Sequence, residues 1–479
     1  MALGAELRRL GKHSAIYGLG GLISRILAVL LLPLYTRYLT PSDYGKVETL
    51  IALTTVIGIV LRLGIHSAFF RFTFDSPDPE RRRVVLRTSF WFTMGMATLG
   101  LGLGLLVSAP LADLLFGSAG DAELVAAALV GLWAGMNYEQ ISSVFRVEER
   151  SVAFVTASVA NILLTVGATL LLVVAFEQGP LGVIVGNFTG TLLVYAVLLG
   201  YRREQLGLQF DRSLLREMNR FGIPLMPTAL FLWTTNFSDR LFLGQLADVR
   251  EVGLYSVGVR IASAMVLILT AFRLAWPAFA YSIEDDREAK RTYAFVLTYL
   301  VTFTTWVATA LALLSPWIVD WLAAPAFATS SRVVGPLAFS TVAFAGYVVV
   351  AIGVGRAKRT QFNWVVTGAA AVVNIALNLV LIPPYGMMGA AIATIAAYAT
   401  MFATMAWWAQ RIFPVPYQWR RVLTAAGTGI ALAVVGKLVD AGLPLALALV
   451  VLYPLALVPL GFYLPAERRA IGARLRLAR

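Results

Sequence analysis

The chain has 479 residues, of which 59% are hydrophobic and only 14% are charged, and its formal net charge is +13. A typical soluble domain is about 45–50% apolar and about 25% charged, so this composition excludes an ordinary soluble protein and predicts an all-α polytopic membrane protein. The absence of cysteine excludes disulfide bonds, thiol catalysis and cysteine metal sites. The positive charges lie in short clusters between apolar runs, as membrane topology requires, so we exclude nucleic acid as a partner.

Apolar runs follow one another along the whole chain, and each is close to the ~20 residues that a membrane-spanning helix needs. The first run follows Arg8, Arg9 and Lys12, as in a signal peptide, but no small-residue cleavage site comes after it. We therefore expect it to be retained as the first span. In total we predict fourteen transmembrane helices, at roughly residues 14–36, 46–67, 88–109, 123–145, 153–175, 180–200, 222–246, 253–275, 293–314, 333–355, 361–382, 388–409, 421–439 and 443–463.

Positive charge alternates between the loops that connect these spans. By this numbering 28 Lys and Arg residues fall on the side of the N-terminus, and only five fall on the opposite side. Positively charged loops stay in the cytoplasm, so the asymmetry predicts a protein of the cytoplasmic (inner) membrane with both termini in the cytoplasm. The five exceptions are Arg37, Lys46, Arg250, Arg332 and Lys437.

The chain also contains a weak internal repeat. Residues 179–186 (GPLGVIVG) resemble residues 386–393 (GMMGAAIA), and residues 146–154 resemble residues 356–362. The repeat places spans 5–6 over spans 11–12, six helices apart, which predicts two pseudo-symmetric six-helix lobes with a substrate site between them. Two C-terminal helices are extra. The predicted divisions are an N-lobe (1–200), a cytoplasmic linker (201–220), a C-lobe (221–410), and spans 13 and 14 with a basic cytoplasmic tail (411–479).

Charged side chains occur inside several predicted spans, although Lys, Arg or Asp at a helix centre costs about 2.5–3.5 kcal/mol. The deep charges are Arg25, Arg62, Asp239, Arg240 and Arg260. Four of the five are arginines, whose planar guanidinium binds phosphate oxygens in pairs. We therefore predict a water-filled cavity whose arginines bind an anionic substrate and repel a cationic drug. Neighbours on a helix point about 100° apart, so a direct pair between Asp239 and Arg240 is not expected.

A second group of polar residues shares one depth in the membrane. Asp239, Arg260, Asn374 and Thr394 fall in a layer roughly 10 Å below the outer surface, at 1.5 Å per residue. Asn378 lies one turn further out on the same helix face as Asn374. One carboxylate with amide and hydroxyl oxygens is compatible with a Na⁺ site. An ion pair between Asp239 and Arg260, with polar hydrogen bonds between helices, explains the same pattern.

The stretch LIPPYGMMGAAIAT, residues 381–394, lies on the outer face by the charge count. Pro383 and Pro384 end one span, and Gly386 allows a tight reversal of the chain. From Gly389 onward small residues let the next span pack closely. The stretch predicts a rigid helical hairpin. Elsewhere, His66 has the position of an interfacial residue, and Glu139 has a position compatible with the cavity but no assigned role.

Three stretches resemble a known family. They are the first span with its internal arginine followed by LTPSDYG (39–45), the segment DRLFLGQLADVREVGLYSVGVRIA (239–262), and GRAKRTQF followed by VVNIALNLVLIPPYGMMGAAIAT (372–394). In these stretches and in its fourteen predicted spans, the chain resembles the bacterial polysaccharide flippases. These are lipid-linked oligosaccharide exporters of the multidrug/oligosaccharidyl-lipid/polysaccharide superfamily.

The resemblance implies two six-helix bundles around a central cavity and transport by alternating access. It implies export of a polyprenyl-pyrophosphate-linked glycan for cell-surface polysaccharide synthesis, with arginines that engage the pyrophosphate. Arg25 matches the first-span arginine of the family. Some relatives that transport lipid II are Na⁺-coupled through polar residues on spans 7, 11 and 12. In such a site a second acidic group would be favourable, whereas this chain has Asn378.

Three other functions are weighed against this one. Within transport, the alternatives are a lipid II flippase and a cation-coupled drug exporter, and coupling to Na⁺ or to H⁺ stays open. A membrane glycosyltransferase or polymerase needs acidic or metal-binding groups and large outer loops, whereas the outer loops here are short. We therefore predict that the chain is not an enzyme and requires no cofactor. Its expected partners are membrane lipids, glycosyltransferases and a polysaccharide polymerase.

Overall fold

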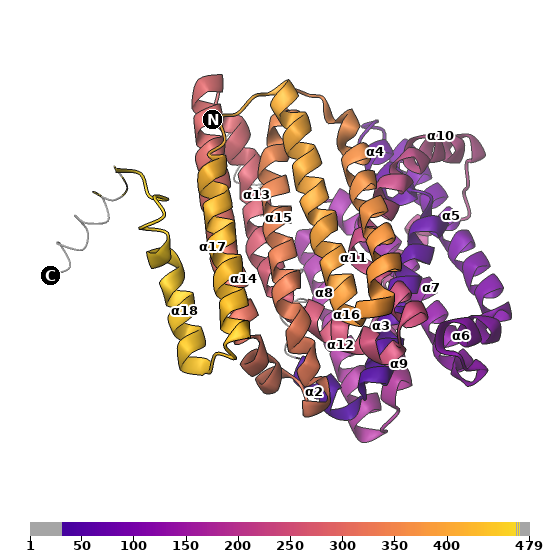
Figure 1. Cartoon of the computed structure of the whole chain (residues 1–479). Coiled ribbons are helices and arrows are strands. Elements are labelled where there is room, and N and C mark those ends of the chain that lie inside the picture. The colour runs from indigo at the N-terminus through magenta and orange to yellow at the C-terminus, as the bar shows by residue number, and fades with distance from the viewer. Residues whose placement is uncertain (1–30, 466, 468, 470–479) are drawn as a thin grey trace. The chain divides into compact units, whose positions relative to one another are not determined.

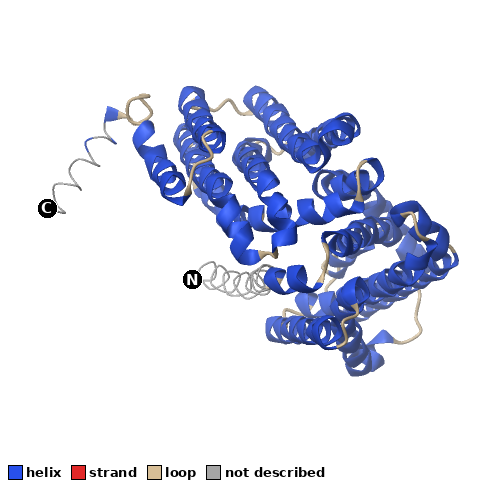
Figure 2. Ribbon diagram, turned by 60° about the horizontal axis from the view of Figure 1, so that its bottom comes forward, coloured by secondary structure: helices blue, strands red, loops and turns tan. Residues whose placement is uncertain are grey.

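The computed structural model describes residues 31–465, 467 and 469. Over these residues the regular structure is helical and no strand occurs, which confirms the predicted all-α architecture (Figures 1 and 2). Arg25 lies outside the described residues, as does most of the predicted first span. By the contacts between its helices the chain divides into two compact units, with the boundary in the sequence between Ser256 and Val257. The predicted lobe boundaries stay predictions.

The N-terminal unit consists of long helices joined by short turns. Its α-helices are α2 (Leu32–Tyr38), α3 (Pro41–Arg62), α4 (Ile65–Thr73), α5 (Pro79–Leu106), α6 (Ser108–Phe116), α7 (Ala122–Val147), α8 (Ser151–Leu170), α9 (Gly179–Leu206), α10 (Arg212–Gly222), α11 (Met226–Leu246) and α12 (Val249–Ala262), of which α12 continues into the second unit. Short 3₁₀ turns precede α7 (Ala119–Asp121) and α11 (Ile223–Leu225), and a π-helical turn (Leu171–Ala175) ends α8. Helices α5, α8 and α9 pack along α7 or along one another, and α11 packs along α3.

The C-terminal unit is a bundle in which α15 packs between α14 and α16, while α17 and α18 pack against α14. Its core is apolar, with Leu297, Val349 and Met401 fully buried. The helices are α13 (Ala264–Ser282), α14 (Asp286–Leu322), α15 (Ser331–Arg356), α16 (Asn363–Ile412), α17 (Trp419–Leu438) and α18 (Leu443–Ala456), with 3₁₀ turns at Pro325–Ser330 and Thr360–Phe362.

Ten helical segments of the described chain are long and apolar enough to cross a membrane. One of them, α16, has 50 residues and covers two of the predicted spans. Helix α11 is not among the ten, because Thr, Asn, Asp and Arg interrupt its apolar sequence, and α18 has only 14 residues. A polytopic helical membrane protein is therefore confirmed, while the number fourteen stays a prediction.

The second and the eighth predicted spans are interrupted by local breaks in the backbone. The second, predicted at 46–67, starts earlier and ends at Arg62, because Leu63 and Gly64 have positive φ angles of 45° and 73° that break the helix. The eighth, predicted at 253–275, is divided at Ser263 between α12 and α13. Hydropathy reports the apolar run but not such local breaks, because the residues on each side stay apolar.

The internal repeat is visible in the backbone. Gly179 and Gly386, which are 207 positions apart, have φ angles of 54° and 52°, and each turns the chain from one helix of a hairpin into the next. Three residues later, a Cβ atom on Gly182 would lie 3.2 Å from the Leu172 carbonyl oxygen, and one on Gly389 would lie 2.2 Å from the Leu381 carbonyl oxygen. Both copies therefore form a hairpin whose turn begins at a glycine with positive φ, and the contact at Gly389 is the closer of the two. Within α16 the reversal predicted at Gly386 is present (Figure 1).

Candidate functional site

Helix α3 begins at a well-defined cap, which fixes the height of its polar residues. The Thr40 side chain accepts a hydrogen bond from the Asp43 amide at 3.2 Å, and Asp43 accepts one from the Thr40 amide at 3.1 Å. This capping box satisfies amides that a helix start leaves free, and Pro41 fits the first turn. The LTPSDYG motif is thus a helix start, and it places Glu48 two turns inside α3.

Glycines bring α3 very close to its neighbours. A Cβ atom on Gly45 would lie 1.9 Å from the Val249 carbonyl oxygen, and one on Gly253 would lie 1.9 Å from the Pro41 carbonyl oxygen. The backbones of α3 and α12 therefore touch at this crossing. At the other end of α3, a Cβ atom on Gly64 would lie 2.2 Å from the carbonyl oxygen of Gly222, just before α11.

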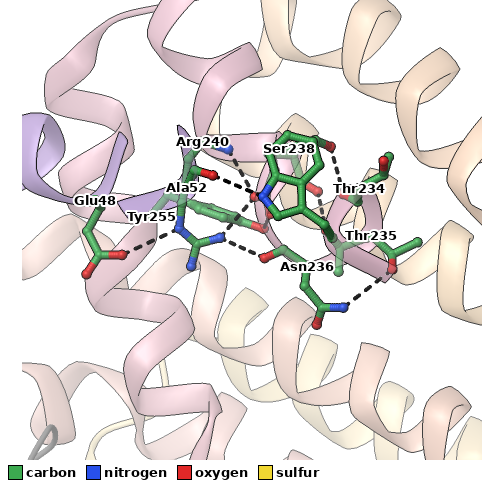
Figure 3. Close-up of polar contacts among 12 residues, drawn as sticks. Glu48, Ala52, Thr234, Thr235, Asn236, Ser238, Arg240 and Tyr255 are labelled. Atoms are coloured by element: carbon green, nitrogen blue, oxygen red, sulfur yellow. Dashed lines mark hydrogen bonds and ion pairs between the residues drawn. The ribbon is translucent and has the colours of Figure 1, made fainter. Parts of the chain in front are cut away.

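Between these two contacts, α3 and α11 enclose a buried polar network (Figure 3). The Arg240 side chain of α11 is only 6% exposed, and its Nε lies 3.5 Å from Oε2 of Glu48 on α3. Its Nη1 donates to Oδ1 of Asp239 at 3.1 Å and to the carbonyl oxygen of Asn236 at 2.8 Å. Two turns nearer the start of α11, Trp233 donates through Nε1 to the Ala52 carbonyl oxygen of α3 at 3.0 Å.

The expectation that Asp239 and Arg240 do not pair is wrong. The 100° between neighbouring side chains separates their Cβ atoms, but the arginine is long enough to fold back along the helix toward Asn236. Oδ1 of Asp239 also accepts from the backbone amide of Arg240 at 3.0 Å, which turns the carboxylate toward the guanidinium. Local backbone hydrogen bonding therefore overrides the simple angular argument.

Asp239 is held from its other side by α12, where the Tyr255 hydroxyl donates to Oδ2. Asp239 and Tyr255 are 3% and 0% exposed. Buried ions are tolerated when each has partners that replace water, and this network supplies a guanidinium, a phenol and backbone groups. The arrangement therefore forms a buried network of ion pairs and hydrogen bonds that holds α3, α11 and α12 together.

A second charged group, the Arg62 cluster, consists of Arg62, His66, Glu139 and Arg146. Nη2 of Arg62 at the end of α3 lies 2.6 Å from Oε2 of Glu139 on α7, and Nε2 of His66 on α4 lies 4.0 Å from Oε1 of the same carboxylate. Arg146 is exposed, stacks at 4.9 Å on the ring of Phe70, and acts electrostatically on His66. The Arg62 and Glu139 side chains are 28% and 46% exposed, so this cluster is open to a ligand, unlike the network around Arg240.

The remaining predicted site residues lie in the C-terminal unit. Asn374, Asn378 and Thr394 are buried on α16, where Nδ2 of Asn378 donates to Oδ1 of Asn374 at 3.1 Å and Thr394 donates to the Ala390 carbonyl oxygen at 3.0 Å. The predicted shared face of the two asparagines is present. Arg260 is half-buried on α12. Within the described residues no group of three or more His, Asp and Glu side chains could hold a metal ion, and a site built from amides falls outside that test.

Sequence reasoning missed two members of the buried network, Glu48 and Tyr255. Glu48 lies two residues after the predicted start of the second span, at 46–67, and that boundary places it near a span end rather than deep in the membrane. The capping signal at Thr40 starts the helix five residues earlier and places Glu48 deeper. Tyr255 gave no signal, because a tyrosine near a span end is ordinary.

The chain matches the model of a family described as "Polysaccharide biosynthesis protein" over residues 34–332. The lipid III flippase of Escherichia coli (strain K12) is 24% identical over 418 residues, which cover 81% of this chain and 92% of that protein. The lipid III flippase of Shigella flexneri is equally similar. The predicted family resemblance is confirmed.

Solved structures share the fold. An inward closed conformation of the lipid II flippase MurJ superposes with a TM-score of 0.74 at 14% identity and covers 92% of this chain and 97% of that one. An inward-facing multidrug resistance transporter of the MATE family, in the MOP superfamily, gives 0.68 at 14% identity and covers 84% and 96%. At these identities the likeness establishes the architecture alone.

Proposed function

Because the chain belongs to the polysaccharide biosynthesis protein family, we propose that it is a flippase that moves a lipid-linked glycan precursor across the cytoplasmic membrane. The observation that carries the proposal is the similarity to lipid III flippases, which extends over 81% of the chain. The ten apolar helical segments and the superposition on a lipid II flippase support a transporter rather than a soluble enzyme.

In the finer form of the proposal, the lipid carrier is a polyprenyl pyrophosphate and the cargo is an oligosaccharide for the cell surface. The pyrophosphate is recognised by guanidinium groups, since their forked donors match phosphate oxygens. Arg62 has the exposure that such a role needs. Arg25 and Arg260 are proposed to act with it, while Arg240, predicted to do so, is held by carboxylates in this state.

Transport itself is proposed to follow alternating access by two six-helix lobes within fourteen spans, with both termini in the cytoplasm. The driving force is proposed to be an ion gradient, of Na⁺ or of H⁺. The coupling ion is proposed to bind side chains that supply carboxylate, amide and hydroxyl oxygens, namely Asp239, Asn374, Asn378 and Thr394. Hard cations such as Na⁺ prefer oxygen ligands of these types.

The proposal is tested by reconstituting the full chain into vesicles loaded with a fluorescent polyprenyl-pyrophosphate-linked oligosaccharide. Translocation is measured as the fraction of glycan that becomes accessible to a glycosidase added outside. We expect transport well above that of protein-free vesicles, and a loss of at least tenfold in Arg62→Gln. Arg71→Gln is the matched control, because Arg71 is 60% exposed and pairs with Asp75 one turn along the same chain segment. Wild-type transport no faster than in protein-free vesicles would overturn the proposal.

The same vesicles separate the candidate cargoes. Two relatives are named for lipid III and one structural neighbour for lipid II. The chain is more similar in sequence to the lipid III flippases, at 24% identity, than to the lipid II flippase, at 14%. We therefore expect a lipid-linked polysaccharide repeat unit to be moved faster than lipid II. Faster movement of lipid II would assign the chain to peptidoglycan precursor transport instead.

A further inference from the structure

The carboxylate of Glu139 forms an ion pair with Arg62, the arginine that the proposed function assigns to substrate binding. Its Oε2 lies 2.6 Å from Nη2 of Arg62, the distance of a strong charge-assisted hydrogen bond. Glu139 lies on α7, eight residues before the end of a membrane-spanning helix, where a carboxylate is costly. Despite that cost the side chain is 46% exposed, so it is not a packed core residue. Its position therefore points to a role toward a ligand.

The backbone builds the cationic side of this cluster in advance. Leu63 and Gly64 leave the helical region with φ angles of 45° and 73°, and this break sets His66 beside Arg62. Gly64 is pressed against the backbone of Gly222, so the break is held by packing. Arg146 adds a second guanidinium from α7, stabilised by its contact with Phe70. An anion that enters meets guanidinium groups already in place.

We propose, on the basis of the proposed function, that Glu139 is an internal competitor for the pyrophosphate of the substrate. In the unloaded protein the carboxylate takes the place of an anion on Arg62. When the substrate binds, a diphosphate takes over Arg62, and the carboxylate moves toward His66, which already lies 4.0 Å from its Oε1. When the substrate leaves, Glu139 returns to Arg62.

Electrostatics explain why a transporter would retain such a carboxylate. A diphosphate that links a lipid to a sugar is doubly charged, so two guanidinium groups would bind it tightly. Transport requires binding that is strong enough for entry and weak enough for release. A carboxylate that competes for the same guanidinium weakens the loaded state by the free energy of its own ion pair, and it covers the guanidinium after release.

The test uses inorganic pyrophosphate as a soluble probe, with the purified full chain in nanodiscs and binding measured by titration calorimetry at one fixed pH. We expect Glu139→Gln to bind pyrophosphate about tenfold more tightly than wild type, because the competitor is removed. Arg62→Gln should lose binding with or without Glu139→Gln. The matched control is Glu148→Gln, since Glu148 is also an acid of the α7 end paired with an arginine, at 2.7 Å from Arg202.

Glu139→Asp guards against a variant that fails to fold, because it keeps the charge and shortens the reach. It should bind pyrophosphate with an affinity between those of wild type and Glu139→Gln. Unchanged or weaker binding by folded Glu139→Gln, or equal tightening by Glu148→Gln, would overturn the inference. Vesicle transport is scored separately. If Glu139→Gln binds pyrophosphate more tightly but the protein moves no lipid-linked glycan, the competition by Glu139 is supported and the proposed function is overturned. If the protein moves lipid-linked glycan but Glu139→Gln does not bind pyrophosphate more tightly, the proposed function is supported and the competition is overturned.

Discussion

Nε of Arg240 lies 3.5 Å from Oε2 of Glu48, and the two side chains, 6% and 8% exposed, form an ion pair between α11 and α3 (Figure 3). Removing one partner of a buried pair leaves the other charge without compensation. We expect Glu48→Ala to lower the free energy of unfolding by up to about 3 kcal/mol, since Asp239 still partners Arg240. The change is measured as a lower midpoint of thermal unfolding in detergent.

Glu123→Ala provides the comparison for Glu48→Ala. Glu123 is exposed in the first turn of α7, so its loss should change stability by less than about 0.5 kcal/mol. If both variants unfold at the wild-type temperature, Glu48 and Arg240 do not stabilise the contact between α3 and α11.

The crossing of α3 and α12 gives a steric prediction. A Cβ atom on Gly45 would lie 1.9 Å from the Val249 carbonyl oxygen, and backbone atoms cannot rotate away as a side chain can. Gly45→Ala and Gly253→Ala should each therefore force the helices apart and cost about 1–3 kcal/mol or more. Thermal unfolding of the purified variants measures this loss.

Gly95 tests the same substitution without the contact. It lies inside α5, and nothing is within 4 Å of a Cβ atom built there. Alanine is a better helix former than glycine by about 1 kcal/mol, so Gly95→Ala should leave the unfolding midpoint unchanged or raise it. A Gly45→Ala variant as stable as Gly95→Ala would contradict the close crossing.

Much of the fold could be read from the sequence because apolar length and glycine position are local properties. The apolar runs predicted most long helices of the described chain, and the repeat at offset 207 predicted the equivalent turns at Gly179 and Gly386. The conformation of such a turn depends on the residue itself, since only glycine adopts these angles without strain. The positions of the long helices and of these glycine turns could therefore be predicted from the sequence.

The partners of the charged residues could not be read in the same way. Hydropathy identified Asp239 and Arg240 as deep charges, but their pairing depends on how the long arginine folds along α11 and on the backbone amide that orients Asp239. Glu48 becomes part of the network only through the packing of α3 on α11. Contacts between distant parts of a chain leave no periodic signal in one sequence.

The turn at Gly386 is itself testable. Its φ of 52° and ψ of −132° are strained for any residue with a Cβ atom, at about 1–3 kcal/mol. Gly386→Ala should therefore lower the thermal unfolding midpoint. Gly427→Ala should not, because Gly427 lies inside α17 with open space around it. Equal midpoints for the two variants would argue against a positive φ at Gly386.

A last ion pair gives a prediction on pH. After α18, Glu467 accepts hydrogen bonds from the Tyr299 hydroxyl, from the Leu464 amide at 2.8 Å, and from Nη2 of Arg421 at 2.8 Å. Burial raises the pKa of the Glu467 carboxyl, but these hydrogen bonds and the Arg421 charge outweigh burial and lower the pKa below its ordinary value of 4.5. The folded C-terminal unit therefore holds this carboxyl in its charged form.

A carboxyl whose pKa is lower in the folded state stabilises the protein above its unfolded pKa, and that stability is lost as the pH falls through the folded pKa. Wild type should accordingly be more stable than Glu467→Gln near neutral pH, and the difference should shrink once the pH falls below about 4.5. Thermal unfolding of both proteins across this range measures the difference. Glu284→Gln, which removes an exposed acid, should show no such convergence. If the difference in stability between wild type and Glu467→Gln stays constant with pH, the charge of the Glu467 carboxylate does not stabilise its contacts with α14 and α17.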